Sequence, residues 1–239
     1  MKSCIIKQPA GVGDVFFLQK IARTYLDKGH SIIWPLRDDI FWISEYIPDI
    51  QWCKLSEWMK DPRSKLFNYA GFGEVEGFIY IDTSTADRTF NTDPNMIMRS
   101  KFGLVGIDHK DWGKYFKFNR KNDREDELYY NILGLNDDSE YVYVNDLTNT
   151  DIRKTSSLGE KEYDYPVIEN RIIDGFSLFD WTKVLENAKE IHTVPTALCY
   201  IVDVIDTKAK TFYYPNDRRH YNDHIDLFTN VTKYVGYEL

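Results

Sequence analysis

The stretch CIIKQPAGVGDVFFLQKIARTYLDKG, residues Cys4–Gly29, decides how the rest of the chain is interpreted. Cys4–Gln8 is a short, mostly apolar run that is typical of a buried strand. The turn Pro9–Asp14 contains two glycines and a proline and ends in an acid. Val15–Gly29 then has apolar residues at helical spacing, and Asp14 stands where a helix N-cap is expected. A strand, a glycine turn and a helix N-terminus together favour negative charge.

Three known glycine signatures could account for this turn, and two of them fail. A dinucleotide-binding fingerprint requires a third glycine at the position of Phe16. A phosphate-binding P-loop requires Gly-Lys-Ser/Thr at the helix start, where this chain has Asp14-Val15-Phe16. What remains is Gly11-x-Gly13-Asp14 opening a helix. Taken alone, this pattern fits a capped α/β turn without chemistry as well as it fits a functional loop.

Length and composition exclude several classes of protein. The chain has 239 residues, enough for one large domain or two small lobes, and 43% of them are hydrophobic and 28% charged, as in a soluble globular protein. A net charge of −8 predicts no nucleic-acid partner, because nucleic-acid binding needs a basic face. No apolar run approaches the roughly 18 residues of a membrane span, and no signal peptide is apparent. Three widely spaced cysteines without a C-x-x-C pair predict reduced thiols and a cytoplasmic protein.

Segments typical of strands and of helices alternate along the chain, and the series occurs twice. Such alternation predicts parallel sheets with both faces covered. The segment 106–124, rich in Asp, Lys, Gly and aromatic residues, is interpreted as the crossing between two lobes, so we predict lobes at 1–115 and 116–239. The predicted strands are Cys4–Gln8, Ser31–Trp34, Ile50–Leu55 and Gly77–Asp82 in the first lobe, and Tyr141–Asn145, Tyr165–Glu169, Glu190–Val194 and Thr211–Pro215 in the second.

Two acidic residues follow strands of the first lobe. Asp14 belongs to the turn after the first strand, and Asp82 ends the fourth. Ligands of parallel sheets bind beyond the carboxyl ends of the strands. We therefore expect Asp14 and Asp82 at the same edge of one sheet.

The turn Gly11-x-Gly13-Asp14 resembles the first loop of the heptosyltransferase-like glycosyltransferases, which have two Rossmann-like lobes in the GT-B architecture. The resemblance implies that Gly11 and Gly13 let an acceptor sugar approach the backbone and that Asp14 is the general base. Asp82, at the same predicted edge, is assigned to this acceptor loop.

A second resemblance to this family lies in Phe179–Ile205, where a helix opened by a Ser-x-x-Asp capping box leads to a strand, a small-residue turn and another helix. In the family this turn holds the diphosphate of the donor. Thr193 and Thr196 occupy it here, and Pro195 suits the first position of the following helix. Asn145, at the end of a neighbouring strand, completes the predicted donor residues on this sheet.

Cations for the donor phosphates are expected in the loop that follows Asn145. Arg153 and Lys154 lie in this loop, and Arg218 follows the last predicted strand. Without the lobe pattern, a solvated basic pair is the better description of Arg153 and Lys154. His192, inside a predicted strand, fits a core histidine at least as well as a ligand.

A metal role is poorly supported by the sequence. His220 and His224 are spaced four residues apart with Asp223 between them, which could bind zinc on a helix. The pair lacks the glutamate that follows the first histidine in a zinc protease, and no Asp-x-Asp motif occurs. We therefore predict no metal and no cofactor apart from a nucleotide-diphosphate sugar as co-substrate.

The sequence thus predicts an α/β protein with two Rossmann-like lobes, a compact GT-B-like glycosyltransferase. The resemblance implies metal-independent, inverting transfer from a nucleotide-diphosphate sugar to a glycan or other hydroxyl acceptor. Large DNA viruses encode similar small transferases, so the expected location is the cytoplasm of a cell or of an infected host. Two alternatives stay open: a non-catalytic nucleotide- or glycan-binding module of this fold, and a Rossmann-type enzyme that modifies sugar nucleotides.

Overall fold

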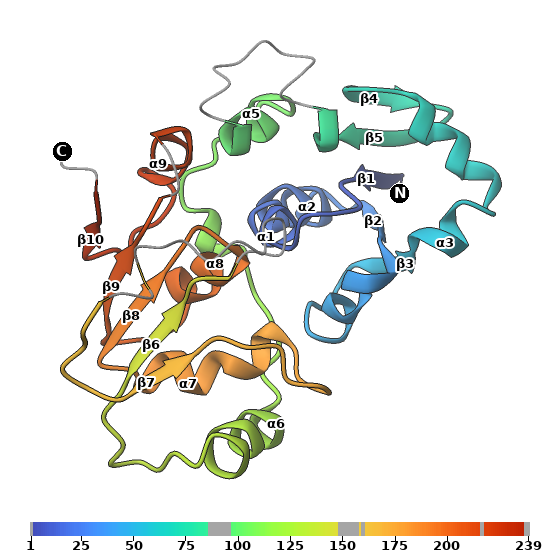
Figure 1. Cartoon of the computed structure of the whole chain (residues 1–239). Helices are drawn as coiled ribbons and strands as arrows, with labels where there is room; N and C mark the ends of the chain where they lie inside the picture. Colours follow the sequence, from blue (N-terminus) through green and yellow to red (C-terminus); the bar gives the residue numbers. More distant parts are fainter. Residues whose placement is uncertain (1, 86–96, 148–157, 159–160, 216–217, 237–239) are drawn as a thin grey trace. The chain divides into compact units, whose positions relative to one another are not determined.

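A computed structural model describes residues 2–85, 97–147, 158, 161–215 and 218–236 of the chain (Figure 1). The chain divides into two compact units, Met1–Asn119 and Arg120–Leu239. The division falls close to the boundary predicted after residue 115. Each unit contains one five-stranded sheet, and each is described by itself.

The sheet of the N-terminal unit is parallel except at one edge. Its strand order is β3-β2-β1-β5-β4, and only β4 runs antiparallel to its neighbour. Cys4, Ile5 and Ile6 of the central strand are completely buried, as expected when both faces of a parallel sheet are covered. The strands are β1 (Ser3–Lys7), β2 (Ser31–Leu36), β3 (Gln51–Lys54), β4 (Phe72–Val75) and β5 (Phe78–Asp82).

Strand β4 was not predicted, because its two central residues, Gly73 and Glu74, are of types that are depleted in strands. It forms a hairpin with β5, and the two connecting residues, Glu76 and Gly77, both have positive φ, at 50° and 83°. Two successive positive φ angles are typical of a tight hairpin turn whose twist matches that of the strands. The turn geometry therefore compensates for the weak strand propensity of β4.

The long helix predicted at Val15–Gly29 is instead two helices, α1 (Val12–Phe17) and α2 (Gln19–Asp27). Gly11 is the N-cap of α1 with a φ of 83°, and no side chain caps this helix. Asp14 therefore lies inside the first turn of α1, so the prediction that Asp14 is the N-cap is wrong. Its negative charge still lies at the favourable end of the helix.

The remaining elements of this unit are short. The predicted helix at Asn95–Val105 is present as α5, and its buried residues include Met98, Lys101 and Phe102. The short helical elements of this unit are η1 (Asp38–Glu45), α3 (Leu55–Trp58), η2 (Pro62–Asn68), η3 (Thr83–Thr85), α5 (Ile97–Gly103) and η4 (Trp112–Lys114).

The sheet of the C-terminal unit is parallel throughout its described strands, in the order β10-β9-β8-β6-β7. The predicted α/β class with parallel sheets is therefore confirmed. The two-residue β10 was not predicted, because so short a strand carries no periodicity. The strands are β6 (Val142–Asn145), β7 (Val167–Glu169), β8 (Glu190–Thr193), β9 (Lys210–Tyr213) and β10 (Lys233–Tyr234).

The predicted capping box is present at the start of η6 (Leu178–Trp181). Ser177 and Asp180 bond each other's backbone N–H groups, and the buried Asp180 also pairs with Arg124 at 2.9 Å. None of the described helices is long and apolar enough to cross a membrane. The other helices of this unit are α6 (Asn122–Asp126), η5 (Glu127–Ile132), α7 (Thr182–Asn187), α8 (Ala197–Val204) and α9 (Arg218–His224).

Candidate functional site

The carboxyl edge of the N-terminal sheet carries a polar network around Asp14. Strands β1 and β5 pair in parallel with Lys7 opposite Asp82, so the segments that follow both strands leave from one edge. The Lys101 ammonium, from α5, bonds Asp14 Oδ1 and also Gln8 Oε1 at 3.1 Å. Thr83 Oγ1 donates to the same Gln8 oxygen at 3.1 Å. Lys101 thus binds one oxygen of Asp14, Gln8 holds Lys101, and Thr83 in turn holds Gln8.

The Asp14–Lys101 pair is unequally exposed. The Lys101 side chain is 8% exposed and the Asp14 side chain 25% exposed. An ammonium this deeply buried needs a charged or hydrogen-bonding partner, and Asp14 supplies the charge. The carboxylate meanwhile stays accessible to a ligand on its open side.

Gly11 is required here for two reasons. Its φ of 83° is unfavourable for any residue with a Cβ, and an added Cβ would overlap Asp14 Oδ2. The second carboxylate oxygen therefore lies directly against the bare backbone of the turn. Gly13 lies within α1, one residue before Asp14.

Asp82 lies at the predicted edge, but the protein itself encloses its carboxylate. It is completely buried, and its Oδ2 accepts a hydrogen bond from Lys7 Nζ at 2.9 Å. Its Oδ1 accepts from Ser84, from Oγ at 2.6 Å and from the backbone N–H at 3.1 Å. Because both oxygens are bonded inside the protein, we interpret Asp82 as an anchor for the segment after β5 and not as a contact for an acceptor.

Sequence reasoning missed Gln8, Thr83 and Lys101. One signal could have found Lys101: it falls on the helical stripe with Met98 and Phe102, where an apolar residue is expected. A lysine at such a position needs a buried anionic or polar partner. Gln8 and Thr83 carry no comparable signal in the sequence.

The carboxyl edge of the C-terminal sheet brings three of the predicted donor residues together. Asn145 pairs with Thr193 across the parallel strands β6 and β8. Its Nδ2 donates to Thr193 Oγ1 at 2.9 Å and to Thr196 Oγ1 at 3.1 Å, while its Oδ1 accepts from Asn170 at 2.8 Å. The cluster is neutral and polar, and it lies at a helix N-terminus, an arrangement that favours anions.

Thr196 is the N-cap of α8, and its hydroxyl accepts from Leu198 N–H at 3.3 Å. Pro195 precedes this cap and is not the first helical residue, so that prediction is wrong. Arg153 and Lys154 lie outside the described residues. Arg218 is exposed and begins α9.

His192 is a buried core histidine with partners for both ring nitrogens. Its Nε2 lies 2.9 Å from Glu190 Oε2, and its Nδ1 lies 2.8 Å from the Tyr214 hydroxyl and 3.3 Å from Lys161 Nζ. Burial lowers the pKa of His192, and the nearby Lys161 ammonium lowers it further. The Glu190 carboxylate raises this pKa but does not cancel the decrease. The neutral ring therefore donates from Nε2 and accepts at Nδ1. This satisfies the residue without any ligand.

No group of three or more His, Cys, Asp or Glu residues in the described part of the chain could hold a metal ion. In the predicted pair His220 and His224, the side chain of His220 lies outside the part of the chain that the structure describes. His224 stacks against Phe228 with ring centroids 5.4 Å apart.

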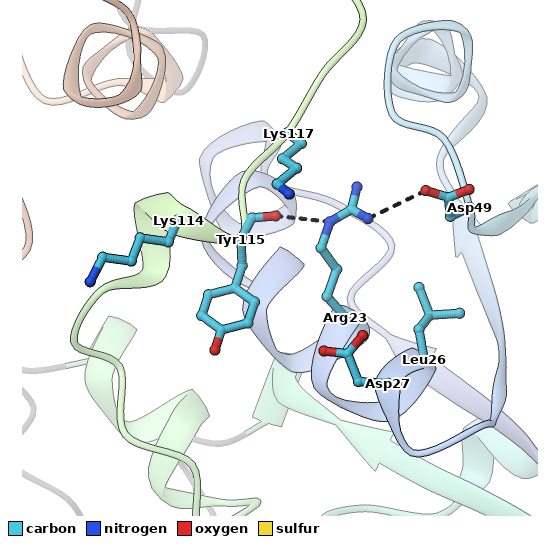
Figure 2. Close-up of a pocket in the computed structure, with 7 residues that line it drawn as sticks. All are labelled: Arg23, Leu26, Asp27, Asp49, Lys114, Tyr115 and Lys117. Atoms are coloured by element: carbon cyan, nitrogen blue, oxygen red, sulfur yellow. Dashed lines mark hydrogen bonds and ion pairs between the residues drawn. The ribbon is translucent and has the colours of Figure 1, made fainter.

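Among the described residues of the N-terminal unit, two cavities are relevant to a ligand site. One, of about 620 Å³, follows the carboxyl ends of β2 and β3, and the backbone N–H of Arg37 in its lining bonds Pro9 O at 2.8 Å. It therefore adjoins the turn that carries Asp14. The other, of about 360 Å³, lies beside the second half of α2, away from this turn (Figure 2). The lining of the larger cavity comprises Arg37, Asp38, Asp39, Leu55, Ser56 and Met59.

By sequence, the chain matches no known family and no curated protein. By structure, it is similar to E. coli ADP-heptose LPS heptosyltransferase II (TM-score 0.58, 11% identity), covering 97% of this chain and 89% of that one. It is also similar to a glycosyl transferase family 9 protein from Veillonella parvula (TM-score 0.55, 10% identity, 95% and 84% covered). A third similar structure is the iron-containing dodecameric glycosyltransferase TibC from enterotoxigenic E. coli (TM-score 0.50, 13% identity). The match covers 90% of this chain and 60% of that chain. At these identities the similarity shows the fold.

Proposed function

We propose that the chain is a glycosyltransferase that moves a sugar from a nucleotide-diphosphate sugar to a hydroxyl acceptor. The observation that carries the proposal is the Asp14 carboxylate, held by Lys101 at the carboxyl edge of a parallel sheet in a chain whose fold matches glycosyltransferases. The polar edge of the second sheet, formed by Asn145, Thr193 and Thr196, supports a separate phosphate-binding role.

In this proposal Asp14 is the general base. Lys101 binds Oδ1, which leaves Oδ2 beside Gly11 to accept the proton of the acceptor hydroxyl. The hydroxyl oxygen forms a bond to the anomeric carbon as the bond to the diphosphate breaks, and attack from the opposite face inverts the configuration. A positioned carboxylate of this kind contributes about 10²- to 10⁴-fold to the rate.

The leaving diphosphate is assigned to the C-terminal unit. The N–H groups at the start of α8, the Thr196 hydroxyl, and the predicted cations Arg153 and Lys154 would stabilise its charge without a metal ion. Replacing Arg153 with alanine is then expected to weaken donor binding by roughly 1.5–3 kcal/mol, the size of a hydrogen bond to a charged group.

The cavity of about 620 Å³ beside the Asp14 turn is a candidate acceptor site. Its charged residues are Arg37, Asp38 and Asp39, and Arg37 is bonded to Asp39 at 2.6 Å. The balance of one cation and two carboxylates favours a neutral, hydroxyl-rich acceptor over a phosphorylated one.

A cytoplasmic location is also proposed, and the free cysteines support it. Cys4, Cys53 and Cys199 form no disulfide. Burial raises the pKa of the Cys199 thiol to about 11, which makes it an unreactive packing residue. The relationship to viral transferases stays a prediction from the sequence.

The proposal is tested by incubating the protein with a panel of ADP-, UDP- and GDP-sugars in excess chelator and measuring release of the nucleoside diphosphate. A transferase without its acceptor slowly transfers sugar to water, and the Asp14→Asn variant should not. A sugar nucleotide that binds but stays intact, with and without glycan acceptors, would identify a binding module instead. A sugar nucleotide converted without loss of its diphosphate would indicate the sugar-modifying enzyme.

A further inference from the structure

The cavity beside α2 contains an arginine whose hydrogen-bonding capacity is only partly used. Arg23 Nε donates to Tyr115 O at 2.9 Å, and Nη1 lies 3.4 Å from Asp49 Oδ2 (Figure 2). Nη2 is buried and has no hydrogen-bond partner among the described residues. A buried donor without a partner is unfavourable, so this guanidinium is poised to bind an additional acceptor.

Asp49 is a weak partner for this guanidinium. Its side chain is 67% exposed while that of Arg23 is 14% exposed, and the contact is long. The Asp49 backbone also has a φ of 71°, which is uncommon for a residue other than glycine. A stronger anion could therefore replace the Asp49 carboxylate with little loss.

A second cation lies on the same side of the cavity. Lys117 is exposed and forms no ion pair within the described part of the chain, and Figure 2 shows its ammonium end pointing to the side of the guanidinium of Arg23. The Asp27 carboxylate also lines the cavity, but Figure 2 shows it well apart from the guanidinium. Lys114, a third lysine in the lining, is paired with Asp111 at 3.3 Å. Positive charge is thus concentrated where Arg23 has unused donors.

We propose that this cavity binds the phosphate group of a small phosphorylated molecule. The planar fork of Arg23 matches two phosphate oxygens, and Lys117 supplies a second positive charge. Nη2 itself is buried in the empty cavity, so a side chain of the lining has to shift before the phosphate can reach this nitrogen. The volume of about 360 Å³ lies within the range of roughly 300–1,000 Å³ for small-molecule sites. This site is separate from the Asp14 turn and does not depend on the proposed transferase activity.

The test is a titration of the full chain with inorganic phosphate and with glucose 6-phosphate at constant ionic strength, followed by calorimetry and by amide chemical shifts. Lys117→Ala should weaken binding by roughly two- to fivefold, the effect of losing one exposed charge. Asp49→Asn should tighten binding, because the competing carboxylate is gone and asparagine tolerates the same backbone conformation. Lys60→Ala, which removes an exposed lysine of the same unit outside this cavity, is the matched control.

Three results would overturn the proposal. The first is the absence of phosphate-dependent heat or shifts at millimolar concentration. The second is an equal effect of Lys117→Ala and Lys60→Ala, which would indicate net charge alone. The third is phosphate binding that Asp49→Asn and Lys117→Ala leave unchanged, which would assign the phosphate to a different site such as the one at Thr196. Binding of glucose 6-phosphate at least as tight as that of inorganic phosphate, with the same response to the variants, would support a phosphorylated molecule as the ligand. Binding of inorganic phosphate without binding of glucose 6-phosphate would overturn this and restrict the site to free phosphate.

Discussion

Replacing Asp14 with asparagine tests both the network at the sheet edge and the proposed chemistry. A capping aspartate could be exchanged for asparagine with little loss of stability. Asp14 is not a cap, however, and its carboxylate neutralises Lys101, whose side chain is only 8% exposed. The substitution therefore leaves a mostly buried ammonium with a neutral acceptor.

The expected loss of stability follows from these contacts. The asparagine oxygen can still accept a hydrogen bond from the Lys101 ammonium, but the attraction between the two opposite charges is lost, so Asp14→Asn should lower the free energy of unfolding by about 1–2 kcal/mol. Complete loss of a buried pair costs about 3–5 kcal/mol, but the asparagine oxygen and the bond from Lys101 to Gln8 reduce this penalty. Turnover should fall by about 10²- to 10⁴-fold.

Lys101→Met is the matched control, because it breaks the same ion pair and keeps the carboxylate. Asp14 is one-quarter exposed, so water can solvate its charge when the ammonium is absent. This variant should lose a similar amount of stability but keep most of its turnover. The contrast between the two variants separates a catalytic carboxylate from a merely structural one.

The assay combines urea unfolding followed by circular dichroism with release of nucleoside diphosphate from the best donor found in the panel. Equal turnover in Asp14→Asn and the parent protein would refute the role of Asp14 as base. Equal loss of turnover in Asp14→Asn and Lys101→Met would show that turnover depends on the intact ion pair and would not identify the carboxylate as the base. Unchanged stability in both variants would contradict the pairing described above.

Three further predictions use other parts of the chain. A nucleoside diphosphate at about 100 times its dissociation constant should stabilise the protein by roughly 2.7 kcal/mol in excess chelator, and a melting shift that requires magnesium or manganese would contradict metal-free binding. Gly11→Ala should reduce both stability and turnover, because the added Cβ would overlap Asp14. Gly29→Ala is the control: Gly29 has a similar φ of 82° and nothing within 4 Å of an added Cβ, so this variant should reduce stability alone. Equal turnover in the two variants would argue against the role of Gly11. Because the pKa of His192 is lowered below its ordinary value of 6.5, the unfolded chain binds the proton first, and stability should fall as the pH drops below about 6.5. His192→Gln should flatten this dependence in unfolding experiments at pH 7 and pH 5, and an unchanged slope would place the acid sensitivity elsewhere.

The sequence was a good guide to the parallel strands and a poor guide to the edges of the sheets. The buried strands β1 and β6 are continuous apolar runs bounded by turns, a pattern that depends only on local composition. Strands β4 and β10 each depend on a neighbouring strand. The hairpin turn holds β4 against β5, and β10 pairs with β9 through two residues. Local propensity therefore could not reveal them.

The first helix shows the same limit. Its apolar stripe indicated a helix after the glycine turn, but the stripe does not mark where the first turn begins. The helix starts at Val12 because Gly11 adopts a positive φ, and it breaks at Leu18. As a result Asp14 moved from the expected cap into the first helical turn.

The sequence by itself determined which residues can carry charge at the ends of the strands, and it determined the double series of strands and helices. Side-chain partners were decided only by the tertiary structure. Asp14 follows β1 and Asp82 ends the neighbouring strand β5, so the two look alike in the sequence. Yet Asp82 is completely buried and bonded to Lys7 and Ser84, while Asp14 stays partly exposed. The lysine that binds Asp14 is Lys101, 87 positions away along the chain. Only folding brings groups so distant in sequence to within hydrogen-bonding distance, because such contacts depend on the path of the whole chain and not on local propensity.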